Sequence, residues 1–215
     1  MARPAYRWPK VPEMTIHRLS VYTRCLRELE EDGVTTISSQ ELAERFNLNS
    51  AQVRKDLTYF GEFGVRGIGY YVTRLRGELQ KILGLDREWP VALVGFGNLG
   101  AALFHHKGFS RQGFKIVVIF DEDPAKTGRE VEGTPILGMQ NVGRELRARG
   151  IQIGVVAVPA EGAQAVADQL VAGGVKAILN FAPTRLRVRR DVRLQSVDLS
   201  IEFETLSFYL TRLGR

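Results

Sequence analysis

The sequence predicts a two-part α/β chain, with an N-terminal winged helix-turn-helix followed by a C-terminal Rossmann-like parallel sheet. Two observations lead to this prediction. Residues 38–60 have the pattern of two short helices joined by a turn, and the second helix is rich in cations. Residues 91–121 contain an apolar strand, the glycine fingerprint GFGNLG, a helix, a second strand and a terminal acid. The pairing indicates one half that binds DNA and one half that binds a dinucleotide.

Bulk composition excludes several classes of protein. The chain has 215 residues and a formal net charge of +6, which is compatible with nucleic acid but also with nothing more than good solubility. The single Cys25 excludes an internal disulfide and a Cys-rich metal site, and no metal is expected. We find no apolar stretch long enough to span a bilayer and no signal-peptide core, so no membrane partner and a cytoplasmic location are expected.

The first half begins with an amphipathic helix. Apolar residues recur at three- and four-residue steps from about Thr15 and end near Gly33. Ser38 and Glu41 then form a capping box that starts a short helix. After a polar turn, Ser50 is expected to cap the next helix.

That next helix is the candidate DNA-reading element, although a purely structural helical corner stays an alternative. Its apolar residues face the core at four- and three-residue spacing, which leaves a polar, cationic face outside. Gln52 suits adenine, and Arg54 or Lys55 suits guanine or phosphate. A glycine-rich hairpin at 61–72 forms a wing whose tip carries Arg66, which suits a minor groove. The predicted DNA-contacting residues are Ser50, Gln52, Arg54, Lys55, Thr58, Tyr59 and Arg66.

The second half has the hydrophobicity pattern of a buried parallel sheet. Continuous β-branched runs at 91–94, 115–120, 151–158 and 177–181 are separated by helical stretches, which predicts a sheet covered on both faces. The last helix carries apolar residues on several sides and must be buried on more than one of them. The expected division of the chain is 1–85, 86–196 and 197–215.

The glycine fingerprint has the context that a dinucleotide site requires. Gly95 permits the tight turn, Gly97 lets backbone N–H groups approach the pyrophosphate, and Gly100 lets the helix pack on the strand. Asp121 matches the expected ribose-binding acid and favours NAD(H) over NADP(H), a preference that Lys126 and Arg129 nearby weaken. The alternative is a nucleotide-free α/β domain with a glycine-rich turn.

Two later strand ends should complete the pocket, because ligands bind at the carboxyl ends of strands in open sheets. Asn180 suits a carboxamide and Phe181 suits the wall of an apolar ring slot, though packing roles explain both equally well. The predicted nucleotide-contacting residues are Gly95, Phe96, Gly97, Asn98, Leu99, Gly100, Asp121, Val158, Pro159, Asn180 and Phe181.

Binding without turnover is the favoured interpretation. His105 and His106 lie far along the helix from the glycine turn, and no Tyr-x-x-x-Lys pair follows a sheet strand, so no catalytic residue is predicted. A small NAD-dependent oxidoreductase with a helical dimerisation domain is the alternative. A regulator that binds coenzyme A is a third hypothesis, and Asp121 argues against it.

Residues 52–70, QVRKDLTYFGEFGVRGIGY, closely resemble the signature of the Rex family of redox-sensing transcriptional repressors. Asn180–Pro183 and the terminal helix that follows Asp198 resemble that family too, and the likeness extends from Val11 to Leu213. The resemblance implies a homodimer that exchanges its last helix between subunits. It also implies a repressor that binds palindromic operator DNA while NAD⁺ prevails and releases it on binding NADH.

The resemblance further implies a switch. Arg18 would pair with Asp198 of the partner subunit in the DNA-binding state. Family members often have a tyrosine at a third position of this switch, where the present chain has His106, which would add pH dependence if it takes part. A solvated helix-end residue is the alternative for His106. The neutral nicotinamide of NADH would enter an apolar slot near Phe181 more readily than the NAD⁺ cation, because desolvating a charge is costly.

Overall fold

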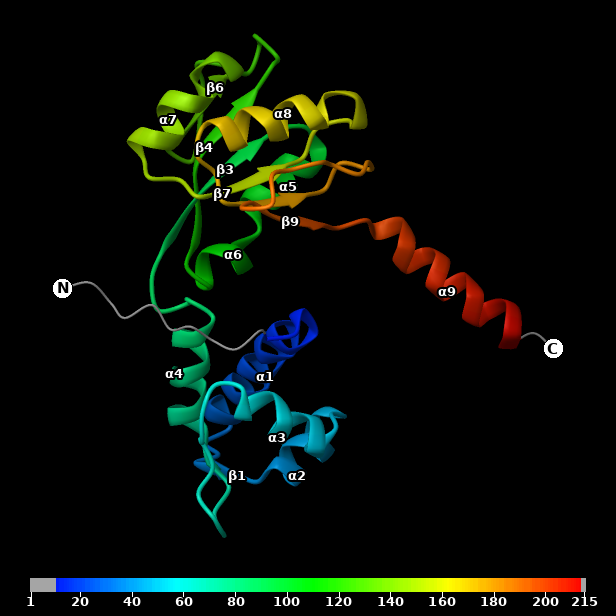
Figure 1. Ribbon diagram of the computed structural model, residues 1–215. Helices are drawn as coiled ribbons and strands as arrows, with labels where there is room; N and C mark the ends of the chain where they lie inside the picture. The colour runs from blue at the N-terminus through cyan, green and yellow to red at the C-terminus, as the bar shows by residue number, and fades with distance from the viewer. Residues whose placement is uncertain (1–10, 214–215) are drawn as a thin grey trace. The chain divides into compact units, whose positions relative to one another are not determined.

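The computed structural model of the chain describes residues 11–213 (Figure 1). Residues 1–10 and 214–215, which belong to the predicted ranges 1–85 and 197–215, lie outside the described residues. The chain divides into two compact units, Met1–Arg87 and Glu88–Arg215. This division falls within two residues of the boundary expected from the sequence.

The first unit is a winged helix-turn-helix, as predicted. The strands β1 and β2 pair antiparallel, and a tight turn between Val65 and Gly69 precedes β2, with the Val65 N–H donating to the Gly69 carbonyl at 2.7 Å. The helices enclose one apolar cluster that includes Leu19, Leu42 and Leu75. Its elements are α1 (Glu13–Glu31), β1 (Thr36–Ile37), α2 (Ser39–Phe46), α3 (Ser50–Thr58), β2 (Tyr70–Tyr71) and α4 (Val72–Ile82).

Helix capping in this unit follows the sequence with one correction. The capping box is present: the Glu41 N–H donates to Ser38 Oγ at 3.1 Å, and the Ser38 N–H donates to Glu41 Oε2 at 2.8 Å. The expectation that Ser50 caps α3 is wrong. Asn49 is the cap and accepts the Gln52 N–H at 2.9 Å, because its extended backbone aims the amide oxygen at the helix start.

The second unit is a seven-stranded sheet in the order β5-β6-β4-β3-β7-β8-β9, and all neighbours are parallel except the antiparallel pair β5 and β6. The four apolar runs predicted as strands become β3, β4, β7 and β8. The elements are β3 (Trp89–Val94), α5 (Asn98–His105), α6 (Lys107–Arg111), β4 (Phe114–Asp121), β5 (Glu130–Val131), β6 (Thr134–Gly138), η1 (Met139–Asn141), α7 (Val142–Ala148), β7 (Ile153–Val156), α8 (Ala160–Ala172), β8 (Ala177–Asn180), β9 (Arg193–Ser196) and α9 (Leu199–Leu213).

Three strands of the second unit were missed by the sequence analysis. The strands β5 and β6 form a hairpin, and β6 extends the sheet by pairing with β4, where Ile119 lies opposite Ile136. The strand β9 pairs with β8 at the opposite edge and is mostly polar and exposed. Short or polar edge strands lack the continuous apolar run that marks a strand buried on both faces.

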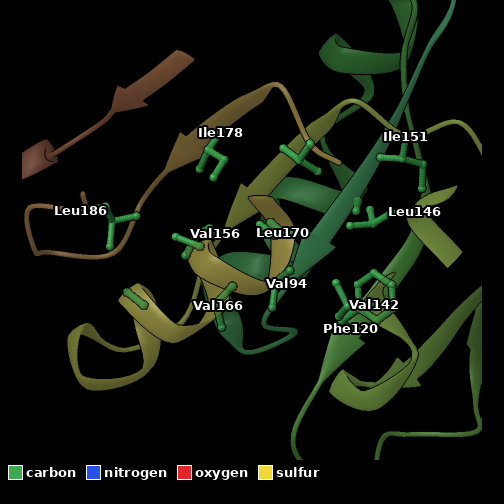
Figure 2. Packing of buried hydrophobic residues seen from close by; sticks show 14 of the residues in the cluster. Val94, Phe120, Val142, Leu146, Ile151, Val156, Val166, Leu170, Ile178 and Leu186 are labelled. Carbon is green, nitrogen blue, oxygen red and sulfur yellow. The ribbon is translucent and has the colours of Figure 1, made fainter. Parts of the chain in front are cut away.

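The sheet has an apolar layer on each face, as a parallel sheet requires. Val94, Phe120 and Val156 point to the face that Leu146 of α7 and Leu170 of α8 cover (Figure 2). A separate cluster on the other face includes Val91, Leu93, Ile119 and Val155, with Leu103 and Phe104 of α5 packed against it.

The helix after the glycine turn is shorter than expected. His105 is the last residue of α5, and His106 has an extended backbone that separates α5 from α6. Within residues 11–213, no helix is long and apolar enough to cross a membrane. Over the same range, no group of three or more His, Cys, Asp or Glu side chains is placed to hold a metal ion.

Candidate nucleotide and DNA sites

The turn between β3 and α5 has the backbone geometry of a phosphate cradle. Gly95 has φ +92°, and a Cβ there would lie 2.5 Å from the Ala157 carbonyl oxygen. A Cβ on Gly100 would lie 2.0 Å from the Gly95 carbonyl oxygen. Gly97 is the N-cap of α5. Apart from its two neighbours in the chain, no described residue has a heavy atom within 4 Å of a Cβ added to Gly97. The close packing and the open approach predicted for the three glycines therefore coexist in one turn.

Asp121 stands at the end of β4, beside this turn. Its Oδ2 accepts the Phe96 N–H at 2.7 Å, and its Oδ1 accepts the Asp123 N–H at 2.9 Å. Lys126 Nζ lies 3.3 Å from Oδ2. Burial alone would raise the pKa of Asp121, but these two N–H groups and the Lys126 ammonium outweigh burial and lower the pKa. The carboxylate is thus ionised where the adenosine ribose is expected.

The end of β7 meets the same turn. Val158 packs against Gly95, where an added Cβ would lie 2.8 Å from Val158 Cγ1, and Pro159 precedes the first residue of α8. Asn98 and Leu99 are exposed in the first turn of α5. Backbone N–H groups at a helix N-terminus favour anions. The carboxyl edge of the sheet therefore gathers the predicted glycine turn, Asp121 and Val158.

Asn180 does not reach this edge as a ligand-binding group. It is fully buried, and its Nδ2 donates to the carbonyl oxygens of Ala182 at 3.2 Å and Thr184 at 3.0 Å. Its Oδ1 accepts the Ala182 N–H at 3.0 Å. The expected carboxamide contact stays a prediction, and these hydrogen bonds argue against it, because the Nδ2 and Oδ1 ends of the amide both hold the loop after β8 in place.

Phe181 lines an apolar cavity of about 230 Å³ on the face of the sheet that α5 covers. The cavity walls are hydrophobic except for Gln112. Such a lining suits an uncharged ring far better than a cation, because a cation would lose its hydration there. The other lining residues include Leu103, Phe109, Val155 and Leu179.

Both candidate histidines of this unit lie at the end of α5 remote from the glycine turn. His105 Nδ1 is 3.2 Å from Glu132 Oε1, and the His106 ring packs edge-on against Phe109 with centroids 4.9 Å apart. Neither position serves proton transfer at the carboxyl edge of the sheet.

The outer face of α3 and the wing carry the predicted DNA contacts. Arg54, Lys55 and Thr58 are exposed, and Ser50 and Tyr59 are half-buried. Arg54 Nη1 donates to Ser39 Oγ at 2.8 Å, and the Thr58 hydroxyl donates to the Lys55 carbonyl at 2.7 Å. Arg66 is exposed in the turn between Val65 and Gly69. The arrangement presents cations at a helix surface and at a narrow tip.

Gln52 differs from the other residues of this face. Its Nε2 donates to Asp56 Oδ1 at 2.8 Å, so the amide is directed along its own helix toward a buried carboxylate. The expected adenine contact is therefore not supported by the position of this side chain.

Asp56 is the residue that the sequence analysis missed. Its side chain is fully buried, and Arg18 donates to it through Nε at 2.5 Å and Nη2 at 2.8 Å. Thr15 Oγ1 at 3.0 Å and the Tyr22 hydroxyl at 2.8 Å complete the group, which we call the Asp56 network together with Gln52. The available signal was an aspartate placed between Val53 and Leu57 on the core-facing side of α3.

The electrostatics of the Asp56 network agree with its geometry. Burial alone would raise the pKa of Asp56, but hydrogen bonds from Arg18, Tyr22, Gln52 and Thr15 lower the pKa to about 2. The hydrogen bond to Asp56 raises the pKa of Arg18, and burial followed by the same carboxylate raises the pKa of Tyr22. The network is a full ion pair inside the winged helix.

The proposed switch residues have other partners within the chain. Arg18 already donates to Asp56. Asp198 is exposed and accepts both the N–H and the hydroxyl of Ser200, at 3.0 Å and 2.6 Å, so it caps the start of α9. The pairing of Arg18 with Asp198 of the partner subunit stays a prediction, as does the role of His106.

The helix α9 is not buried within its own chain. Phe203 is 74% exposed and Leu210 is 69% exposed, and further exposed apolar residues are Leu199, Ile201, Leu206, Phe208 and Tyr209. The sequence analysis expected burial on several sides. The apolar surface therefore needs a covering that the single chain does not provide.

Comparisons with known proteins agree with the two halves. A family described as "Putative DNA-binding protein N-terminus" matches residues 10–58, and a family described as "CoA binding domain" matches residues 86–184. The first match covers α1 to α3, and the second begins just before β3 and covers the glycine turn and Asp121.

Curated relatives and solved structures match almost the whole chain. The redox-sensing transcriptional repressor Rex of Syntrophomonas wolfei is 52% identical over 96% of this chain and 98% of the relative. That of Desulfitobacterium hafniense is 50% identical over 93% and 95%. The crystal structure of RSP in complex with β-NAD⁺ and operator DNA is 38% identical, with a TM-score of 0.92, and covers 96% of this chain and 95% of RSP. That of RSP in complex with β-NADH has a TM-score of 0.86 at 37% identity and covers 96% of this chain and 97% of RSP. Sequence and structure together place the chain in the Rex family of redox-sensing transcriptional repressors.

Proposed function

We propose that this chain is a DNA-binding transcriptional repressor that senses the NADH/NAD⁺ ratio. As a homodimer it binds palindromic operator DNA through α3 and the wing when NADH is low, and it releases the operator when NADH binds. Membership of the Rex family supports this function, as do the RSP complexes with operator DNA, β-NAD⁺ and β-NADH. The single observation that carries it is the ionised Asp121, held 2.7 Å from the Phe96 N–H beside an open glycine turn.

The nucleotide is held by backbone and carboxylate. The phosphates approach the N–H groups at the start of α5 through the open position at Gly97, and Asp121 accepts from the adenosine ribose. The apolar cavity beside Phe181 takes the uncharged nicotinamide of NADH in preference to the NAD⁺ cation. A nearly complete switch requires a difference of about 5.5 kcal/mol in binding free energy between the two states.

The dimer is held in part by α9, which carries the exposed apolar residues described above. Two copies related by a twofold axis place two α3 helices on two half-sites of a palindrome. Binding of NADH changes the spacing of these helices, and the operator is released.

The ligand is sensed and not turned over. The relatives are repressors, and both histidines of the described part of the second unit lie at the end of α5 that is remote from the glycine turn. Coenzyme A is disfavoured as the ligand because Asp121 repels the 3′-phosphate carried by its ribose. We place the protein in the cytoplasm, where its operator and the nicotinamide pool are found.

The test is a titration of operator retention with NADH and with NAD⁺ at one stated salt concentration, since protein–DNA affinity depends steeply on salt. The wild-type chain should release DNA with NADH and retain it with NAD⁺. Asp121→Asn should require about tenfold more NADH, because a neutral amide accepts more weakly from the ribose. Glu122→Gln is the matched control, since this exposed neighbour should leave the titration unchanged.

Operator retention that does not change at saturating NADH would disprove the proposed function. The oxidoreductase alternative would instead be supported by NADH consumption with carbonyl substrates and by no selective retention of any palindrome. Calorimetry with NADH and with coenzyme A separates the two candidate ligands.

A further inference from the structure

The Asp56 network joins the DNA-reading helix α3 to helix α1 through directional bonds. Arg18, Thr15 and Tyr22 all come from α1, and Gln52 and Asp56 both lie on α3. Both carboxylate oxygens are saturated: Oδ1 accepts from Thr15, Arg18 and Gln52, and Oδ2 accepts from Arg18 and Tyr22.

A saturated ion pair of this kind defines one orientation. The apolar contacts between the two helices are non-directional and tolerate sliding and rotation. The hydrogen bonds to a buried carboxylate do not, because each donor must keep its distance and angle. Successive residues of a helix differ by about 100° around its axis. Holding Asp56 inward therefore also holds its neighbours Arg54 and Lys55 at fixed outward angles.

We propose that Asp56 is a positioning residue for operator recognition, an inference that rests on the proposed function. Gln52 belongs to the same network and does not read bases. Base edges are recognised only when the helix enters the major groove in one register. Phosphate contacts hold any DNA sequence and tolerate small rotations of the helix. Loosening α3 from α1 therefore weakens binding to the operator more than binding to other DNA.

A second, separate prediction concerns Gln52. If it read a base, Gln52→Ala would relax the preference at one base pair of each half-site. As a member of the Asp56 network, Gln52→Ala lowers affinity for the operator and for each single-base variant of the operator by the same factor.

The experiment compares two DNA probes at one salt concentration. The first is the duplex that the wild-type chain enriches from a random-sequence library, and the second is a scrambled duplex of the same length and composition. For Asp56→Asn, the ratio of the two affinities should fall by about tenfold or more, while the scrambled duplex is bound within about twofold of wild type. Glu28→Gln, which removes an exposed carboxylate from α1, is the control for the change in charge.

Two measurements separate positioning from simple loss of structure. Helix content and the thermal midpoint are recorded for every variant, and DNA binding is measured well below that midpoint. NADH affinity should stay at the wild-type value in all of them, because Asp56 belongs to the other unit. If Asp56→Asn does not fold, Tyr22→Phe removes one donor while it keeps the ring, and its affinity ratio should fall severalfold.

An unchanged affinity ratio in Tyr22→Phe, and in Asp56→Asn if it folds, overturns the proposal and leaves Asp56 a purely structural ion pair. A relaxed preference at one base pair in Gln52→Ala returns Gln52 to base readout. A wild-type chain that enriches no sequence at all refutes the proposed function instead, so the two failures are distinguishable.

Discussion

The glycine turn provides a pair of substitutions with opposite expected effects. At Gly97 the φ of −81° suits alanine, and an added Cβ has open space around it among the described residues. At Gly100 the added Cβ would lie 2.0 Å from the Gly95 carbonyl oxygen, a backbone atom that cannot rotate away. Gly97→Ala should therefore fold normally, and Gly100→Ala should not.

The magnitudes follow from these distances. Gly97→Ala restricts the unfolded chain and should raise the free energy of unfolding by about 0.4–1 kcal/mol. Gly100→Ala forces α5 away from β3 and should lower it by about 1–3 kcal/mol or more. In the proposed site, the methyl group of Gly97→Ala would stand where the dinucleotide phosphates approach the backbone, so NADH affinity should fall by about tenfold, which is about 1.4 kcal/mol.

Thermal unfolding and calorimetric titration with NADH measure the two effects separately. Gly162→Ala in α8 is the matched control, because it too is open in the part of the chain that the structure describes, and it lies within a helix. It should gain about 0.5–1 kcal/mol of stability and bind NADH as wild type does. A Gly97→Ala chain with wild-type NADH affinity would show that the phosphates do not approach this turn.

Three further predictions concern DNA, pH and assembly. Lys55→Glu should weaken operator binding by about tenfold or more and leave NADH affinity unchanged in calorimetry, and an unchanged gel shift would remove Lys55 from the contact surface. The pKa of Asp56 falls from its ordinary 3.8 to about 2 on folding. It therefore contributes about 2 kcal/mol to the free energy of unfolding above pH ~4, and this contribution is lost as pH falls through about 2. Urea unfolding monitored by hydrogen exchange in α1 and α3 measures the difference in free energy of unfolding between wild type and Asp56→Asn. As pH falls from about 4 through about 2, this difference should decrease by that amount. A difference that does not change with pH would contradict the cause assigned to the pKa shift. Phe203→Asp should convert the dimer to a monomer in light scattering, since a charge on the exposed apolar face of α9 cannot be buried; a variant that stays dimeric would place the interface elsewhere.

Local patterns were enough to predict most elements of both units. The capping box joins Ser38 and Glu41 three residues apart, and each of the four apolar strands and the glycine fingerprint occupies one short stretch of sequence. Such patterns can be recognised from spacing, so the two-unit organisation followed from the sequence alone, whereas the nucleotide contacts at the carboxyl edge of the sheet stay a prediction. The edge strands β6 and β9 escaped because they are short or polar.

The hydrogen-bond partners of individual side chains could not be predicted from the spacing of residues in the sequence. Asp56 meets Arg18 across 38 residues, and Asp56 also accepts from Gln52, which directs the Gln52 amide along its own helix. Asn180 lies at a strand end where ligands bind, yet the fold turns its amide into its own loop. The sequence establishes which polar groups exist and on which element they stand. The tertiary structure determines which of these groups hydrogen-bond to each other. A buried polar group needs a partner, and only the packed chain determines which partner is within reach.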